Sequence, residues 1–199
     1  MKFYKFISVI LHPIVVPTLG VLLYFILIPN RMGSNQKLAI LGLVFVVTYL
    51  VPLFVLIILK VFELIKSYKL HSIKERKIPI CLMIVLYYLL GNTLSRITMI
   101  RDLGTLFYAT SFGLVIIYLL FIFKTKTSLH LFSLGISVGF FMLLSTRYLI
   151  SFLPIILILI LISGLLASAR LYLKAHTPKE VYLGFLLGVI SPFIIHSIL

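Results

Sequence analysis

Three residues whose types suit phosphate chemistry lie close together near the end of the chain. Arg170, His176 and Glu180 follow an Arg-x5-His-x3-Glu pattern at the mouth of an apolar run. An arginine guanidinium is a planar donor that can bind two phosphate oxygens at once. A histidine is a potential nucleophile, and a carboxylate on its second ring nitrogen fixes its tautomer and direction. The pattern therefore indicates a group that can hold a phosphate and attack it.

A structural interpretation of part of this segment stands beside the chemical one. Thr177-Pro178-Lys179-Glu180 is also typical of a helix start, with Thr177 as the N-cap, Pro178 at the first helical position and Glu180 closing a capping box. Glu180 can serve the helix, the histidine or both.

Two further polar clusters lie earlier in the chain. Residues 127–130 place two hydroxyls and an imidazole before an apolar run, a pattern equally typical of a hydroxyl N-cap followed by an interfacial histidine. Lys69 and Arg76 are seven residues apart, so on a helix they lie on one face, two turns apart. Contacts with lipid headgroups explain such basic side chains equally well.

The cluster near the end of the chain resembles a signature of the type 2 phosphatidic acid phosphatase (PAP2) superfamily of integral membrane phosphatases. That signature reads Ser-Arg-x5-His-x3-Asp. Arg170 and His176 match it, Glu180 stands where the family has aspartate, and Ala169 separates Ser168 from the arginine.

The two earlier clusters resemble the family's other signatures, in the same order along the chain. Ser128 and His130 match the Pro-Ser-Gly-His signature, with Thr127 and Leu129 in place of proline and glycine. Lys69, Arg76 and Lys77 align with Lys-x6-Arg-Pro, in which lysine replaces the proline. Together the matches cover a little over half of the chain.

The resemblance implies a role for each of these residues. His176 is expected to form a phosphohistidine, His130 to protonate the leaving group, and Glu180 to orient His176. Phosphate is expected to be bound by Lys69, Arg76, Ser128, Leu129 through its backbone N–H, and Arg170. The implied function is hydrolysis of a phosphomonoester or pyrophosphate on a lipid headgroup. The alternative is a non-catalytic PAP2-like membrane protein that binds lipid phosphate or acts as a scaffold.

The elements that must position these residues are membrane helices. The chain has 62% hydrophobic and 11% charged residues and a mean hydropathy of +1.26, whereas soluble domains carry about 25% charged residues. Spans in lipid are helices or closed barrels, and no part of the sequence alternates as barrel strands do. We therefore predict an all-α polytopic transmembrane bundle of six to seven spans, forming one domain over residues 1–199.

Seven apolar runs are candidates for these spans. They cover residues 6–28, 38–59, 78–94, 105–123, 129–144, 148–169 and 181–199. We interpret the first run as a retained span that Pro13 and Pro17 can break. The GxxxG spacing that lets helix backbones approach occurs twice, at Gly135/Gly139 and Gly184/Gly188.

Charge and composition set the expected surroundings of the protein. A net charge of +14 suits an anionic lipid surface or a phosphate-bearing substrate. The sequence has no basic, aromatic-rich soluble region for nucleic acid and no His/Cys cluster with metal-ligand spacing. We expect a multi-pass protein of the cell (inner) membrane that meets membrane lipids and a lipid phosphate or pyrophosphate, without nucleic acid, metal or cofactor. Charge counting favours the cytoplasmic face for the site and the resemblance favours the outer face, so the face stays open.

Overall fold

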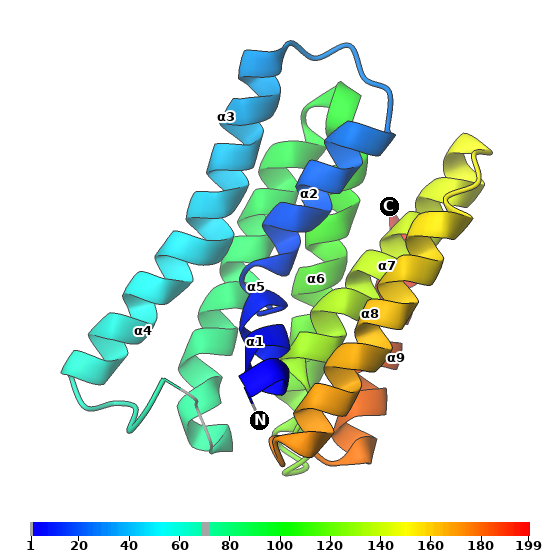
Figure 1. The fold of residues 1–199 in the computed structure, drawn as a ribbon. Coiled ribbons are helices and arrows are strands. Elements are labelled where there is room, and N and C mark those ends of the chain that lie inside the picture. Colours follow the sequence, from blue (N-terminus) through cyan, green and yellow to red (C-terminus); the bar gives the residue numbers. More distant parts are fainter. Residues whose placement is uncertain (1, 69–71) are drawn as a thin grey trace. The chain divides into compact units, whose positions relative to one another are not determined.

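The computed structural model describes residues 2–68 and 72–199, and its regular elements there are all helices (Figure 1). In chain order the elements are α1 (Lys2–Ile10), α2 (Val16–Leu27), α3 (Ser34–Phe45), the π-helical turn η1 (Val46–Leu50), α4 (Val51–Val61), α5 (Ile73–Ser95), the 3-10 turn η2 (Thr98–Ile100), α6 (Arg101–Leu120), α7 (Leu129–Tyr148), α8 (Leu153–Tyr172) and α9 (Pro178–Ile198).

Six helical segments of the described chain are long and apolar enough to cross a membrane. They are Ser34–Val61, Ile73–Ser95, Thr98–Leu120, Leu129–Tyr148, Leu153–Tyr172 and Pro178–Ile198. A helix needs about 20 apolar residues to cross roughly 30 Å of hydrocarbon, and each of these segments meets that length. The prediction of an all-α polytopic bundle is confirmed, and the chain is a multi-pass membrane protein.

The first apolar run is broken, as its prolines predicted. α1 ends at Ile10 and α2 begins at Val16, with Pro13 in the link between them. The twelve residues of α2 rise only about 18 Å at 1.5 Å per residue, which is too short for the hydrocarbon core. Residues 6–28 therefore do not form one continuous helix, because proline cannot continue the helical hydrogen bonding through the link. That this run is a retained span stays a prediction.

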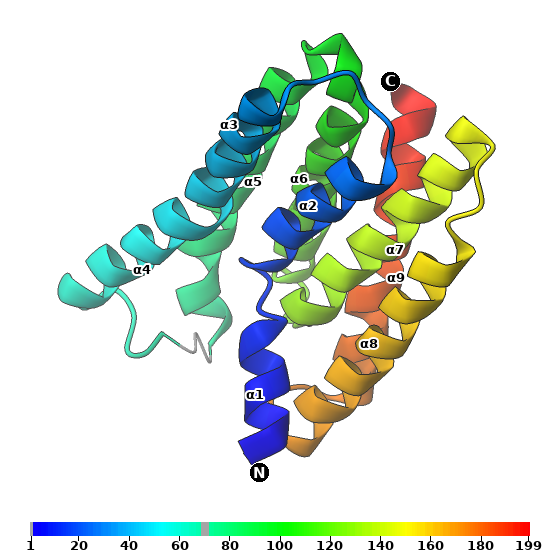
Figure 2. The same ribbon diagram turned by 45° about the horizontal axis from the view of Figure 1, so that its top comes forward.

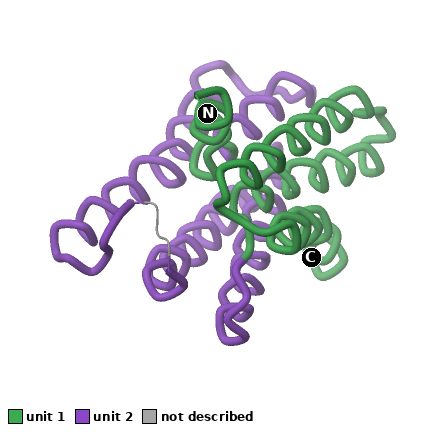
Figure 3. Tube along the Cα trace, turned by 60° about the horizontal axis from the view of Figure 1, so that its bottom comes forward, with its two compact units in different colours: residues 1–16, 127–199 green, residues 17–126 purple. Residues whose placement is uncertain are grey.

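The chain forms two compact units, shown in different colours in Figure 3. Unit 1 comprises Met1–Val16 and Thr127–Leu199, and unit 2 comprises Pro17–Lys126. In unit 2, α5 packs along α6, and both η1 and α4 pack against α5. The prediction of a single domain stays a prediction. Unit 1 contains both ends of the chain and most of the predicted site residues.

Within unit 1, α7 packs between α8 and α9, and α1 lies against α8 (Figure 2). The contact between α7 and α9 uses both predicted GxxxG pairs. A Cβ added to Gly135 or Gly139 would collide with backbone of α9, and one added to Gly188 would collide with backbone of α7. The predicted role of these glycines in helix packing is confirmed, and it brings two predicted site segments together at the first turns of α7 and α9.

An apolar cluster closes the same end of unit 1. Leu131 of α7, Leu166 of α8 and Val181 of α9 are all nearly inaccessible and pack together. Ile7 and Leu11, from α1 and the residue after it, pack against this cluster. The segment around α1 is therefore fixed beside the beginnings of α7 and α9 and the end of α8.

Candidate functional site

The predicted nucleophile and its predicted partner are in contact. His176 Nδ1 lies 2.7 Å from Oε2 of Glu180, and the histidine side chain is only 2% exposed. A carboxylate accepts hydrogen bonds, so Nδ1 carries the proton and donates it to Glu180. In the neutral ring Nε2 then holds the lone pair. This is the arrangement of an imidazole oriented to act as a nucleophile or base.

Glu180 also caps α9, so the two interpretations of this carboxylate hold together. Its backbone N–H donates to Thr177 Oγ1 at 3.4 Å, and its Oε2 accepts from the Thr177 N–H at 3.3 Å. These two bonds form the capping box that the sequence predicted. The same oxygen therefore fixes both the start of the helix and the direction of the His176 ring.

The start of α7 is held directly against the start of α9. The Ser128 N–H donates to the Glu180 carbonyl at 3.0 Å. A Cβ added to Gly184 would lie 2.6 Å from the Ser128 carbonyl oxygen, so only glycine permits this approach. The second and third predicted clusters are thus joined by backbone contacts, independently of any side chain in the proposed chemistry.

Two hydroxyls at the start of α7 are buried without a protein partner. Ser128 is 0% exposed and Thr127 is 1% exposed, and neither side-chain oxygen has a hydrogen-bond partner among residues 2–68 and 72–199. Ser128 occupies the N-cap position of α7 but makes no side-chain cap bond. The interpretation of Ser128 as a simple capping residue is therefore not realised. Leaving a buried hydroxyl without a partner costs about 1–3 kcal/mol, so these oxygens suit a ligand.

Arg170 and His130 complete the cluster in unit 1. Arg170 lies in the last turn of α8, and its Nη1 donates to Ser8 Oγ at 2.7 Å. His130 lies in the first turn of α7, with Nε2 3.2 Å from the Ser8 carbonyl oxygen. Arg170 and His176 both lie near enough to His130 to act on it electrostatically. One cation and two imidazoles, all predicted site residues, therefore meet at one end of unit 1.

Ser8 and His12 were not predicted as members of this cluster. The His12 ring packs edge to face against His130, with 5.1 Å between ring centroids. Burial, followed by the charge of Arg170, lowers the pKa of His12, which keeps its ring neutral at pH 7. The sequence signal that could have pointed here is the pair His12-Pro13 in the first apolar run. The Ile14 N–H does donate to His12 Nδ1, at 3.5 Å.

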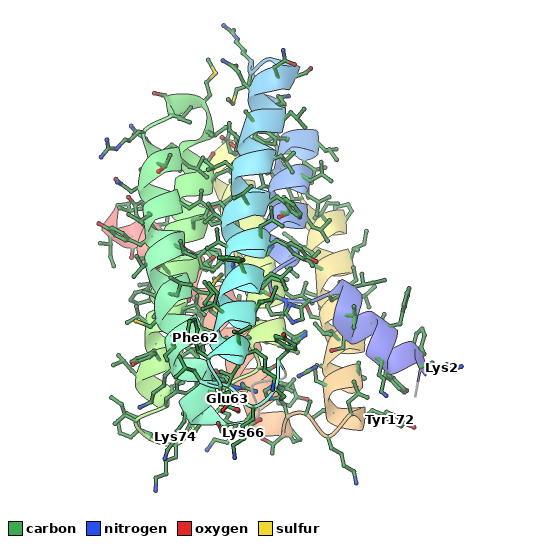
Figure 4. All side chains as sticks on the ribbon, turned by 90° about the vertical axis from the view of Figure 1, so that its left-hand side faces the viewer. Lys2, Phe62, Glu63, Lys66, Lys74 and Tyr172 are labelled. Carbon is green, nitrogen blue, oxygen red and sulfur yellow. The ribbon has the colours of Figure 1, made fainter. Side chains whose placement is uncertain are left out.

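Only one member of the predicted basic pair, Arg76, lies in the part of the chain that the structure describes. Arg76 lies in unit 2, on α5, and this helix begins only at Ile73 because Ser72 and Glu75 form its capping box. Lys69 lies outside the described residues. The helix α5 does not continue back through Ser72, whose backbone is extended, and the placement of Lys69 relative to Arg76 stays a prediction. Lys66 and Lys74 are further cations on this side of unit 2, and the Lys66 N–H donates to Glu75 at 2.8 Å (Figure 4).

The described residues contain no group of three or more His, Cys, Asp or Glu side chains placed to hold a metal ion. No protein-family model, curated protein or solved structure matches the chain. The resemblance to the PAP2 superfamily therefore rests on the signature residues alone. Chemically, the cluster offers an oriented imidazole, a second imidazole, a guanidinium and buried hydroxyls at a helix N-terminus, which together suit phosphoryl transfer.

Proposed function

We propose that this protein is a membrane lipid phosphatase that hydrolyses a phosphomonoester or pyrophosphate on a lipid headgroup through a phosphohistidine. The observation that carries the proposal is the contact of the buried His176 with Glu180, 2.7 Å apart, in the same unit as His130 and Arg170. Orientation of a histidine by a carboxylate is what a nucleophilic imidazole needs. A lipid is the favoured substrate because the cluster lies at the ends of helices that are apolar enough to cross the bilayer.

In the first step, phosphate is held by the Arg170 guanidinium, the Ser128 hydroxyl and the Leu129 N–H in the first turn of α7. The Nε2 lone pair of His176 attacks phosphorus in line with the bond to the leaving oxygen. The N–P bond forms as the P–O bond breaks, and a His130 ring that is protonated on both nitrogens in the substrate complex gives its Nδ1 proton to the departing oxygen and becomes neutral. Glu180 stabilises the positive charge that develops on the His176 ring.

In the second step, water cleaves the phosphohistidine. His130, now neutral, accepts a proton from water while the water oxygen attacks phosphorus and the N–P bond breaks. Inorganic phosphate leaves and His176 regains its lone pair. Because the Ser8 carbonyl accepts from Nε2 of His130, the nitrogen that exchanges protons with the substrate is Nδ1. Lys69 and Arg76 stay predictions as additional phosphate ligands.

The test is phosphate release by the purified full chain in detergent micelles. The substrates are phosphatidate, phosphatidylglycerol phosphate, a polyprenyl diphosphate and lipid A. We expect at least one to be hydrolysed by the wild type and none by His176→Ala, because the attacking nitrogen is lost. His196→Ala is the matched control, since His196 is exposed near the far end of α9. Labelled substrate should leave an acid-labile, alkali-stable phosphate on the wild type and on His196→Ala, but not on His176→Ala.

Normal turnover by His176→Ala overturns the mechanism. If the wild type binds a lipid phosphate but releases none, the non-catalytic scaffold function is favoured instead.

A further inference from the structure

A single residue of α1 accepts hydrogen bonds from two groups of the proposed site. Ser8 Oγ accepts from Arg170 Nη1 at 2.7 Å, and the Ser8 carbonyl oxygen lies 3.2 Å from His130 Nε2. Ser8 is buried, as is His130. In the proposed function these two donors serve the phosphate and the leaving group. The helix α1 therefore contacts both the side chain proposed to bind phosphate, Arg170, and the side chain proposed to protonate the leaving group, His130.

The chemistry of the four atoms fixes the direction of both bonds. A guanidinium can only donate, so the Ser8 hydroxyl oxygen is the acceptor. A carbonyl can only accept, so His130 Nε2 carries a proton, which leaves Nδ1 as the nitrogen for proton transfer. A 2.7 Å bond from a charged donor is in the strong, charge-assisted range. Both site groups are thus held in one orientation by the same residue.

The Ser8 carbonyl is available because α1 stops early. In a longer helix this carbonyl would accept from the His12 N–H, but that N–H bonds to Val9 O at 3.3 Å instead. Pro13 cannot continue the helix, and the last carbonyls of any helix lack intrahelical partners. The end of a helix also carries partial negative charge, which favours a neighbouring cation such as Arg170. The break in the first apolar run therefore creates the acceptor.

Packing on both sides of Ser8 keeps α1 in place. The rings of Tyr4 and Tyr172 are 4.3 Å apart between centroids, and Tyr172 marks the end of α8 in Figure 4. Ile7 packs into the apolar cluster of unit 1. His12, four residues after Ser8, lies edge to face on His130. These contacts hold Ser8 in register with Arg170 and His130.

We propose that Ser8 is a positioning residue of the phosphate site, orienting the Arg170 guanidinium through its hydroxyl and the His130 ring through its carbonyl. The inference rests on the proposed function. Ser8 engages only one of the five N–H donors of a guanidinium and only one nitrogen of the imidazole, so a phosphate can bind the same side chains while Ser8 stays bonded. This geometry fits positioning rather than blockage of the site.

Ser8→Ala tests the hydroxyl contact, because it removes the acceptor for Arg170 and leaves the backbone carbonyl for His130. With phosphatidate, or whichever panel lipid is hydrolysed fastest, we expect kcat/KM to fall about tenfold, the loss of one hydrogen bond to a charged group. The loss should appear chiefly in KM, since Arg170 binds phosphate before the reaction. Ser8→Thr keeps the hydroxyl and should retain most of the wild-type kcat/KM.

The matched control is Ser168→Ala. Ser168 is exposed on α8, two residues from Arg170, and its hydroxyl donates to the Gly164 carbonyl. It should behave as the wild type. Should Ser8→Ala fold poorly, Ser8→Cys has nearly the same volume but offers only a weak acceptor, and the same loss is expected. Apparent melting temperatures of all variants in detergent separate lost positioning from lost stability.

A double-mutant cycle decides whether Ser8 acts through Arg170. In an Arg170→Lys background the Ser8 hydroxyl no longer has a guanidinium to orient, so adding Ser8→Ala should change phosphatidate binding and kcat/KM by less than about twofold. An equal loss in both backgrounds overturns the proposal. A gain of activity in Ser8→Ala also overturns it, because Ser8 would then block the site.

The same variants keep this inference distinct from the proposed function. If the wild type releases phosphate and Ser8→Ala matches it, only the inference fails. If the wild type releases none, the proposed function fails, and binding to phosphatidylcholine vesicles containing phosphatidate decides the inference. Weaker binding by Ser8→Ala than by Ser168→Ala then supports positioning, and equal binding contradicts it.

Discussion

The helices α7 and α9 both have a hydroxyl residue at the N-cap, but the two hydroxyls make different contacts. At α9, Thr177 is an N-cap whose hydroxyl accepts from the Glu180 N–H, and the capping box is complete. At α7, Ser128 is the N-cap, yet its buried hydroxyl makes no cap bond and has no partner in the described part of the chain. The two starts are in direct backbone contact, but Thr177 is exposed and Ser128 is fully buried.

This difference separates hydroxyls that serve the fold from hydroxyls that suit a ligand. A capping hydroxyl contributes about 1 kcal/mol to stability, whereas a buried hydroxyl without a partner reduces it. Ser128 should therefore matter for phosphate and Thr177 for the helix. The carboxylate of Glu180 has both kinds of role, because its Oε2 accepts from the Thr177 N–H in the capping box and from the His176 ring.

Glu180→Gln should produce the largest effect, and it separates the two roles of this residue. Glutamine can still close a capping box, but it is not an anion and cannot stabilise a charged His176 ring. We expect turnover to fall by up to about 10⁴-fold, the loss caused by the equivalent change in a serine-protease triad. The apparent melting temperature in detergent should stay close to that of the wild type.

Glu180→Asp is the control, since it keeps the charge and shortens the reach, and it should retain more activity than Glu180→Gln. Normal turnover by Glu180→Gln would show that the carboxylate serves only the helix.

Ser128→Ala should have the next largest effect on turnover and the opposite effect on stability. Removing one preorganised donor to phosphate lowers rates by about 10²-fold or more. The loss of an unpaired buried hydroxyl should leave the free energy of unfolding unchanged or higher. The matched change, Thr177→Ala, should lower that free energy by about 1 kcal/mol and reduce turnover less. Phosphate release and thermal unfolding of both variants check the pair, and equal effects in both assays would remove the distinction between the two starts.

Gly184→Ala should show the smallest effect, arising from the contact between the two starts. Its Cβ would lie 2.6 Å from the Ser128 carbonyl oxygen, so backbone must move. Overpacking of this kind costs about 1–3 kcal/mol, and the shift should also lower kcat/KM. Gly164→Ala on α8 is the control, because its Cβ meets no described atom within 4 Å. The measurement is the unfolding of both variants in detergent. Equal stability would mean that the backbone at Ser128 can move to accept a Cβ at position 184 without cost.

Local pattern was enough to predict much of this architecture. Apolar length predicted the membrane helices, Pro13 predicted the break before α2, and the GxxxG pairs predicted the close contact of α7 with α9. The His176–Glu180 contact was also predictable, because its partners are four residues apart and the intervening turn is capped. In each case the interactions that determine the feature lie within one or two helical turns, or depend only on the absence of a Cβ at the glycines.

The contribution of Ser8 was not predictable from sequence. Its partners are 122 and 162 residues away along the chain, and a lone serine in an apolar helix carries no signature. The packing of α1 on α8 decides the contact, and no local spacing encodes that packing. The start of α5 at Ile73, in contrast, is local, because Ser72 and Glu75 form a capping box that the seven-residue spacing did not take into account.

Unit 1 is built from two segments that are far apart along the chain, and this has a consequence for the synthesis of the protein. Its first segment, Met1–Val16, leaves the ribosome before any of unit 2, and its second, Thr127–Leu199, follows after all of unit 2. At about 5–20 residues per second, roughly 8–30 seconds separate the synthesis of Ser8 from that of Arg170. During that interval α8, against which α1 packs, is not yet complete. The phosphatase site that we propose therefore cannot form before α9 has been synthesised.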